Sequence, residues 1–188
     1  MSKLLSVLFS LRLIPHICVF YTSAHKDLLI YERDRWLQSH GLTKRGCRGL
    51  LLLLNSYREY RSLFYFRTKA TWLSFFAKPQ NNLEFYSESN QIGRGLIIWH
   101  GFSTVINVES MGEDCEIWQN VTIGKSSTDN LPNRPHIGNR VKVTANSVVI
   151  GNIVIADDVT IAAGAVAVKN IPDEGAIIVS QPSRIIAR

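Results

Sequence analysis

The chain has 188 residues, of which 46% are hydrophobic and 19% are charged, and its formal charge is +6. These values exclude a disordered chain, allow one or two folded domains with a sizeable core, and suit an anionic partner such as a nucleotide-bearing cofactor, an acidic glycan or a membrane surface; no motif for nucleic acid is present. The three cysteines, Cys18, Cys47 and Cys115, are odd in number and lack C-x-x-C spacing, which argues against a disulfide framework or a zinc site and favours a reducing, cytoplasmic compartment.

The N-terminal segment is apolar from Leu4 to Tyr21, but Arg12, Pro15 and His16 interrupt it. A membrane-spanning helix needs about 20 largely uncharged residues, and no clear cleavage site follows, so neither a span nor a signal peptide is predicted. We expect an amphipathic helix that packs within the protein or against a partner chain. A peripheral contact with the inner face of the membrane stays open as an alternative.

Residues 1–78 are predicted to form an α-helical N-terminal domain. The segment 25–41 has apolar residues at helical spacing, and the segment 49–67 has the broad apolar side of a buried helix or a subunit contact. Pro79 and the polar residues after it mark the change to a second domain, residues 79–188.

In the second domain, aliphatic residues recur with a period of six, often followed by glycine or another small residue. They are Ile92, Ile98, Val105, Met111, Ile117, Ile123, Ile137, Val143, Val149, Ile155, Ile161 and Ala167. A repeat of six predicts a parallel β-helix, in which three short strands and three tight turns close one triangular coil of eighteen residues. One coil cannot bury its apolar face alone, so the coils must stack.

Two interruptions break this period. One extra residue lies between Ile98 and Val105, next to His100. About eight surplus residues separate Ile123 from Ile137, which predicts that the segment 124–136 protrudes as a loop. Irregular loops on a rigid scaffold are where function is commonly carried.

Four stretches of the second domain resemble a known family: "IGRGLIIWHG", "CEIWQNVTIG", "VKNIP" and "SQPSRIIAR". They resemble serine acetyltransferases and polysaccharide O-acetyltransferases of the hexapeptide-repeat acyltransferase superfamily, over about residues 85–188. The resemblance implies a left-handed β-helix and a homotrimer. It also implies acetyl-CoA bound in the groove between neighbouring β-helices, and a histidine general base that activates an acceptor hydroxyl.

His100 stands where the family has its reacting histidine. Taken alone, a lone histidine after three apolar residues is better explained by the protein core. A neutral imidazole can take the proton of a hydroxyl as it attacks a thioester, and it titrates near the working pH.

The period predicts a column that stacks Ile98, Ile117, Ile137 and Ile155. By the same count, His100 lies beside Gln119, then Asn139 and Asp157. Gln119 or Asn120 then orients the imidazole or the acceptor; alternatively these residues form a polar ladder that only satisfies turn hydrogen bonds.

The sequence departs from serine acetyltransferases where the resemblance places serine recognition. Trp99 replaces an aspartate before the histidine, and Phe85, with Glu84 beside it, replaces a second one. Arg134 replaces a loop histidine, and His136 is displaced by two residues. Glu84 is the candidate substitute acid, with a solvated carboxylate as the alternative. Arg134 and His136 are candidate acceptor contacts, or else a solvated loop.

Trp99 offers a flat apolar surface that suits a sugar ring, and Trp118 is a second candidate contact. We therefore predict an acetyl-CoA-dependent O-acetyltransferase that modifies a sugar hydroxyl in surface polysaccharide, capsule or O-antigen. A serine O-acetyltransferase of cysteine biosynthesis is the alternative.

The candidate cofactor residues lie in the later coils. Ala145, Ala163 and Gly164 are small enough to let a pantetheine arm approach the backbone, although corner sterics alone also explain them. Lys169 and Arg184 are candidate partners of the cofactor phosphates.

Two other classes of protein fit the sequence less well. The β-helical carbonic anhydrases need three histidines around zinc, and the β-helix here has only His100 and His136, so no metal is expected. A non-catalytic β-helix used for assembly would need neither His100 nor the loop.

Overall fold

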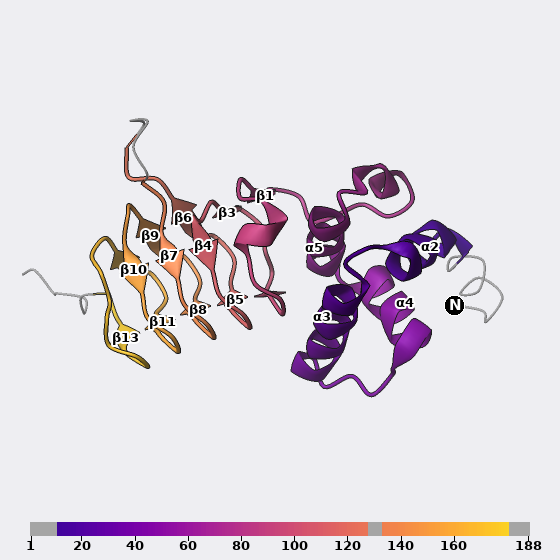
Figure 1. Ribbon diagram of the computed structural model, residues 1–188, viewed down its shortest axis with the longest axis horizontal. Helices are drawn as coiled ribbons and strands as arrows, with labels where there is room; N and C mark the ends of the chain where they lie inside the picture. The colour runs from indigo at the N-terminus through magenta and orange to yellow at the C-terminus, as the bar shows by residue number, and fades with distance from the viewer. Residues whose placement is uncertain (1–10, 128–132, 181–188) are drawn as a thin grey trace, which may run out of the picture.

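The computed structural model describes residues 11–127 and 133–180. Helices gather at one end of the molecule and strands stack into coils at the other, so the two parts lie end to end along the longest axis (Figure 1). The helical part comes first in the chain, and the β-part follows, as the sequence predicted.

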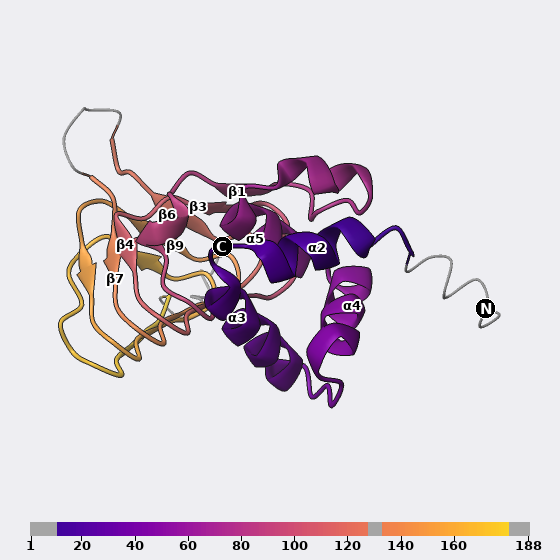
Figure 2. The same ribbon diagram turned by 45° about the vertical axis from the view of Figure 1, so that its right-hand side comes forward.

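Within the described residues, the helical part contains four α-helices and a 3-10 helix. They are α2 (Ile14–Thr22), α3 (Lys26–Ser39), α4 (Gly46–Ser56), α5 (Arg58–Thr68) and η1 (Thr71–Phe75). Their packing, seen from a second side in Figure 2, encloses a core whose fully buried members include Phe20, Trp36, Leu50, Leu53 and Leu63. None of the helices in the described ranges is long and apolar enough to cross a bilayer.

α3 confirms the helix predicted within 25–41, whereas the single helix predicted over 49–67 is wrong. The chain breaks at Tyr57, whose backbone is extended (φ −116°, ψ 110°), so α4 and α5 are separate helices. The ring of Tyr57 packs edge-on against His40 and Trp36, with ring centroids 4.4 and 6.2 Å apart. Aromatic packing against α3 therefore outweighs the local helical pattern.

The β-part forms three parallel sheets that run along the stack. The first contains β1 (Leu83–Phe85), β3 (Thr104–Ile106), β6 (Thr122–Gly124), β9 (Val148–Ile150) and β12 (Val166–Ala167). The second contains β4 (Ser110–Met111), β7 (His136–Ile137) and β10 (Val154–Ile155). The third contains β2 (Ile97–Ile98), β5 (Glu116–Ile117), β8 (Lys142–Val143), β11 (Thr160–Ile161) and β13 (Ile177–Ile178). Each strand pairs with strands one coil away, which confirms the β-helix.

The predicted column is right in its first step, Ile98 to Ile117, and in its third, Ile137 to Ile155, but wrong in the step between them. Ile98 pairs with Ile117, but Ile117 then pairs with Val143 and not with Ile137. Ile137 and Ile155 lie on the second sheet. The cause is the number of surplus residues between β6 and β7, because partners on either side of that segment, such as Ile117 and Val143, are further apart in sequence than one regular coil.

One inward position also differs from the prediction. Ile106 is fully buried and pairs with Ile123, whereas Val105 pairs with Thr122 on the outer face and is half-buried. Relative to the regular spacing of six, the inward residues Ile98 and Ile106 on either side of the His100 corner are therefore two residues further apart. The next inward residue, Met111, follows Ile106 one residue sooner than the regular spacing. A strand alternates its faces, so a shift of one residue exchanges inward and outward side chains.

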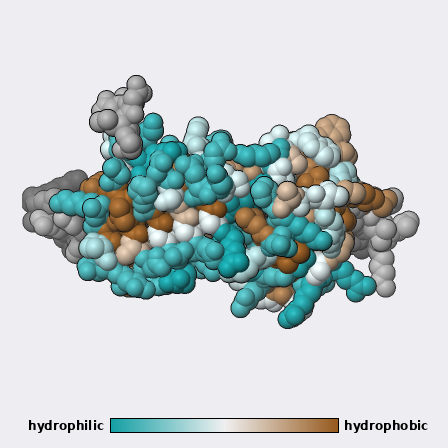
Figure 3. Space-filling view, viewed as in Figure 1, coloured by the Kyte–Doolittle hydropathy of each residue, from teal (hydrophilic) through white to brown (hydrophobic). Residues whose placement is uncertain are grey.

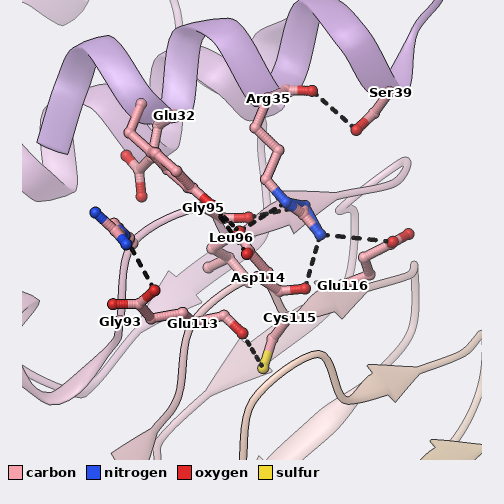
Figure 4. A network of polar contacts seen from close by, with 12 residues as sticks. Glu32, Arg35, Ser39, Gly93, Gly95, Leu96, Glu113, Asp114, Cys115 and Glu116 are labelled. Carbon is pink, nitrogen blue, oxygen red and sulfur yellow. Dashed lines mark hydrogen bonds and ion pairs between the residues drawn. The ribbon is translucent and has the colours of Figure 1, made fainter. Parts of the chain in front are cut away.

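Polar contacts fasten α3 to the first two coils (Figure 4). Arg35 donates to the carbonyl oxygens of Gly95 and Asp114 at 3.0 and 2.7 Å, and its Nε lies 2.8 Å from the Asp114 carboxylate. The hydroxyl of Tyr31 donates to the same carboxylate at 2.9 Å. The helical part is thus held in one orientation on the β-helix.

Candidate active site

His100 occupies the corner between β2 and β3, and its side chain is exposed. Its backbone has φ +54°, and the N–H of Phe102 donates to its carbonyl oxygen at 2.5 Å, which closes a tight turn around Gly101. The exposure rules out a core histidine. Strained backbone of this kind is found preferentially at functional sites.

The ring of His100 makes no hydrogen bond or ion pair with any residue that the structure describes. The turn itself is nonetheless tightly packed at Gly101 against neighbouring side chains. A Cβ on Gly101 would lie 2.6 Å from Cγ2 of Ile98 and 3.2 Å from Cδ2 of Leu83, so only glycine fits there. The inner side of the turn is tightly packed while the imidazole faces solvent.

Glu59 of α5 also lies beside this turn: its Cγ is 3.6 Å from the place of a Cβ on Gly101. Sequence reasoning missed this half-buried carboxylate because nothing in the local pattern links α5 to a coil corner so far along the chain. Glu84, the predicted acid, lies on β1 opposite Val105 with its side chain exposed. Among the described residues, it makes no contact with His100.

Gln119 and Asn120 hold the same corner one coil further on. β2 and β5 pair up to Ile98 and Ile117, and after the corner the N–H of Asn120 donates to the carbonyl oxygen of Phe102 at 3.0 Å, so Gln119 lies at the corner one coil after the His100 turn. The Oε1 of Gln119 is buried and has no hydrogen-bond partner among the described residues. Asn120 has φ +55°, and its amide donates to Oδ1 of Asn146 at 2.9 Å. Asn120 therefore belongs to a polar ladder, while Gln119 keeps an unused acceptor.

Ala145 and Ala163 follow Gln119 at this corner, and they replace the predicted Asn139 and Asp157. The N–H of Asn146 donates to the carbonyl oxygen of Gln119, and the N–H of Gly164 to that of Ala145, at 3.1 and 3.0 Å. The corner thus continues from His100 through small residues, and Ala163 and Gly164 are exposed. Small side chains therefore occupy this corner in the later coils.

Trp99 and Trp118 lie on the outer face of the third sheet. The indole N–H of Trp99 donates to Oε2 of Glu116 at 2.8 Å. Its ring centroid is 4.8 Å from that of His40 and 6.0 Å from that of Trp118. Trp99 is half-buried, and it joins the end of α3 to the His100 corner.

Arg134 and His136 are not brought to His100 within one chain. His136 is on β7 of the second sheet, and its Nδ1 lies 3.0 Å from the hydroxyl of Ser110. Arg134 forms an ion pair with Glu109, with Nη2 2.6 Å from Oε2. His136 thus lies on the second sheet, whereas the His100 corner joins the third sheet to the first, and Arg134 precedes the same strand as His136.

Of the two predicted phosphate contacts, Lys169 is exposed beyond β12, away from the His100 corner. Arg184 lies outside the described residues. Within the described ranges, no group of three His, Cys, Asp or Glu side chains is arranged to hold a metal ion.

Comparison with known proteins places the chain among acetyltransferases. No family model matches the sequence. The serine acetyltransferase of Helicobacter pylori (strain ATCC 700392 / 26695) is 33% identical over 141 residues, which cover 74% of this chain and 81% of that protein. The chain belongs to the hexapeptide-repeat acyltransferase family.

Two further members of this acyltransferase family are similar. A protein of Escherichia coli K12 named as a colanic acid biosynthesis acetyltransferase, WcaB, is 40% identical over 95 residues, or 50% of this chain and 57% of that protein. The structure of a serine acetyltransferase from Brucella abortus in complex with coenzyme A aligns with a TM-score of 0.66 at 16% identity, covering 90% of this chain and 70% of that one. The fold is thus a left-handed β-helix preceded by helices, as predicted, and this acyltransferase is an acetyltransferase.

Proposed function

We propose that this acetyltransferase transfers the acetyl group of acetyl-CoA to a sugar hydroxyl of a surface polysaccharide, with His100 as general base. The observation that carries the proposal is the corner itself: the imidazole of His100 is exposed in a turn with positive φ, and small residues occupy the same corner in the later coils. WcaB, named for polysaccharide biosynthesis, matches at 40% identity over half of the chain.

The chemistry follows from the position of the imidazole. His100 takes the proton of the hydroxyl as the oxygen attacks the thioester carbonyl. The carbon–sulfur bond then breaks, and the imidazolium returns the proton to the departing thiolate. The negative charge that develops on the carbonyl oxygen needs N–H donors, and the amide of Gln119 stands one coil away.

Transfer to serine is the second candidate, because several relatives are named serine acetyltransferases and the Helicobacter match spans most of both chains. Trp99 and Arg134 argue for the sugar. Trp99 stands in place of an acidic side chain next to His100, and Arg134 is held by Glu109. Neither arrangement offers the amino group of serine a carboxylate.

A homotrimer is part of the proposal. Exposed aliphatic side chains on the later coils suit a contact between β-helices, and hydrophobic surface is visible over these coils in Figure 3. They include Val154, Val166, Val168, Ile177 and Val179. A neighbouring chain could then bring its Arg134 and His136 to the groove beside His100.

The test is release of free thiol from acetyl-CoA, with serine and a panel of sugars and oligosaccharides as acceptors. His100→Asn is the informative variant, because asparagine tolerates a positive φ and keeps the turn. We expect it to lower the rate by about 100-fold or more. The matched control is His25→Asn, an exposed histidine before α3. Turnover with serine alone would refute the sugar acceptor, and full activity of His100→Asn would refute the general base.

A further inference from the structure

Charge is divided unevenly between the two parts of the chain. Residues 1–78 contain thirteen Lys and Arg against four Asp and Glu, a formal charge of +9. Residues 79–188 contain eight Lys and Arg against eleven Asp and Glu, a formal charge of −3. No acidic residue precedes Asp27. An anionic partner is therefore attracted to the helical part and repelled by the β-helix.

Part of this positive charge lines a cleft of about 470 Å³ beside η1. Among the residues that the structure describes, four cations line it, Arg12, Arg58, Arg61 and Lys78, and no carboxylate does. The guanidinium of Arg61 donates to carbonyl oxygens, including those of Lys78 and Asn55 at 2.6 and 3.3 Å. Burial, followed by repulsion from Arg12 and Arg58, lowers the pKa of Arg61. This crowding of like charges would be relieved by an anion.

Large apolar side chains stand in water around the same cleft. Phe75, which lines it, is 89% exposed, and Trp72, also on η1, is 57% exposed. Leu11 and Ile14, on either side of Arg12, are 52% and 49% exposed. Apolar colour accordingly shows at this end in Figure 3. Contiguous exposed apolar surface marks an interaction site.

We propose that this end of the helical part docks on a bilayer that contains anionic phospholipid. Aromatic and aliphatic side chains enter the interface, and flanking Lys and Arg bind the lipid phosphates. A purely anionic glycan would leave Trp72 and Phe75 in water. A second copy of this surface would bring like charges together.

The docking surface and the candidate active site share helix α5. Arg58 lines the cleft, and the next residue, Glu59, lies beside the turn of His100. Docking therefore holds the His100 corner near the membrane surface, where an acceptor carried on a lipid is within reach. This consequence rests on the proposed function, whereas docking itself does not.

Sedimentation with lipid vesicles tests the docking without any acetyl transfer. The vesicles are phosphatidylcholine with or without about one third phosphatidylglycerol, each at about 0.05 and 0.5 M salt. We expect the full chain to bind the anionic vesicles at least about tenfold more strongly at low salt, and to lose most of that gain at high salt.

Two double variants locate the surface. Arg58→Glu with Lys78→Glu, and Trp72→Ala with Phe75→Ala, should each weaken binding about tenfold or more. The matched controls are Lys125→Glu with Lys142→Glu, and Tyr86→Ala, all exposed on the β-part, and these should bind like the wild type. A glutamate at the first position of α5 suits the helix dipole, so the Arg58→Glu change should leave folding intact.

Three outcomes would overturn the proposal. The first is equal binding of the chain to neutral and anionic vesicles, and the second is an equal loss of vesicle binding in the control variants. The third is a change in oligomer size, measured by light scattering, in the Trp72→Ala, Phe75→Ala variant without weaker vesicle binding. The last result would assign the surface to a second copy. A loss of activity in His100→Asn with unchanged vesicle binding would separate the two proposals.

Discussion

Arg67 and Glu32 form an ion pair that water does not reach: Nη2 lies 2.7 Å from Oε1, and the side chains are 0% and 2% exposed. Arg67 also donates to the carbonyl oxygens of Ser89, Ile92 and Gly93, each at 2.7 Å. One side chain on α5 therefore joins α3 to the first coil of the β-helix. The two parts of the chain are expected to unfold together.

Glu32→Gln should lower the free energy of unfolding by about 3–5 kcal/mol, because it leaves the Arg67 charge buried without a counter-charge. Urea unfolding followed by circular dichroism measures this change. Glu88→Gln is the matched control, since Glu88 pairs with Lys69 where both side chains are mostly exposed. It should have no measurable effect. Equal losses in the two variants would contradict the assignment.

His16 should make the protein acid-sensitive. Its ring is fully buried, with Nε2 2.8 Å from the hydroxyl of Tyr65. Burial, then the charges of Arg61 and Arg12, lower its pKa from 6.5 to about 4. The unfolded chain thus binds a proton more readily, and stability that is complete above about pH 6.5 should fall by up to about 3 kcal/mol on acidification to about pH 4.

Unfolding free energies at several pH values between these limits test the assignment. His16→Gln should remove most of this slope, and His25→Gln, at an exposed position, should keep it. A slope unaltered in His16→Gln would show that another group controls the acid sensitivity.

Gly112 should tolerate no side chain, because the coils approach closely there. A Cβ on Gly112 would lie 2.7 Å from the backbone of both Gly138 and Asn139, whereas a Cβ on Gly124 would find its nearest atom at 3.8 Å. Gly112→Ala is expected to cost about 2 kcal/mol or more, and Gly124→Ala less than about 0.5 kcal/mol, in thermal or urea unfolding. Comparable stability of the two variants would argue against the coil spacing described.

Variants of Gln119 and Asn120 should distinguish a catalytic role of this corner from a structural one. Gln119→Leu removes a buried acceptor that has no partner among the described residues, so stability should hold while kcat falls about tenfold through loss of the amide. Asn120→Gly keeps the positive φ and removes the bond to Asn146, so kcat should stay within about twofold. Steady-state kinetics on folded variants decide between them; the reverse order would place catalysis on Asn120.

The period of six predicted the β-helix and the pairing of Ile98 with Ile117, and both are confirmed. The same period predicted the wrong partner across the segment 124–136. The prediction took the next aliphatic residue, Ile137, as the residue that stacks on Ile117. The true partner of Ile117 is the residue that reaches the same sheet, Val143. A repeat shows that residues are equivalent, but the path of the intervening loop determines which equivalents stack.

The break at Tyr57 has a similar origin. The apolar residues on both sides of it continue at helical spacing, so the local pattern favours one helix. The ring of Tyr57 contacts Trp36 and His40, which lie on and at the end of another helix. Contacts of that kind depend on how α3 sits and leave no periodic trace in the chain.

The sequence by itself determined that this chain coils and that His100 interrupts the coil, because both are matters of spacing along the chain; the acyltransferase assignment came from the resemblance of four stretches to a known family. Only the tertiary structure decided which side chains surround His100. It replaced Asn139 and Asp157 by Ala145 and Ala163, placed Glu59 beside the turn, and gathered Arg12, Arg58 and Phe75 around one cleft. The physical reason is that these neighbours come from segments far apart in sequence, whose proximity is set by burial of their shared core.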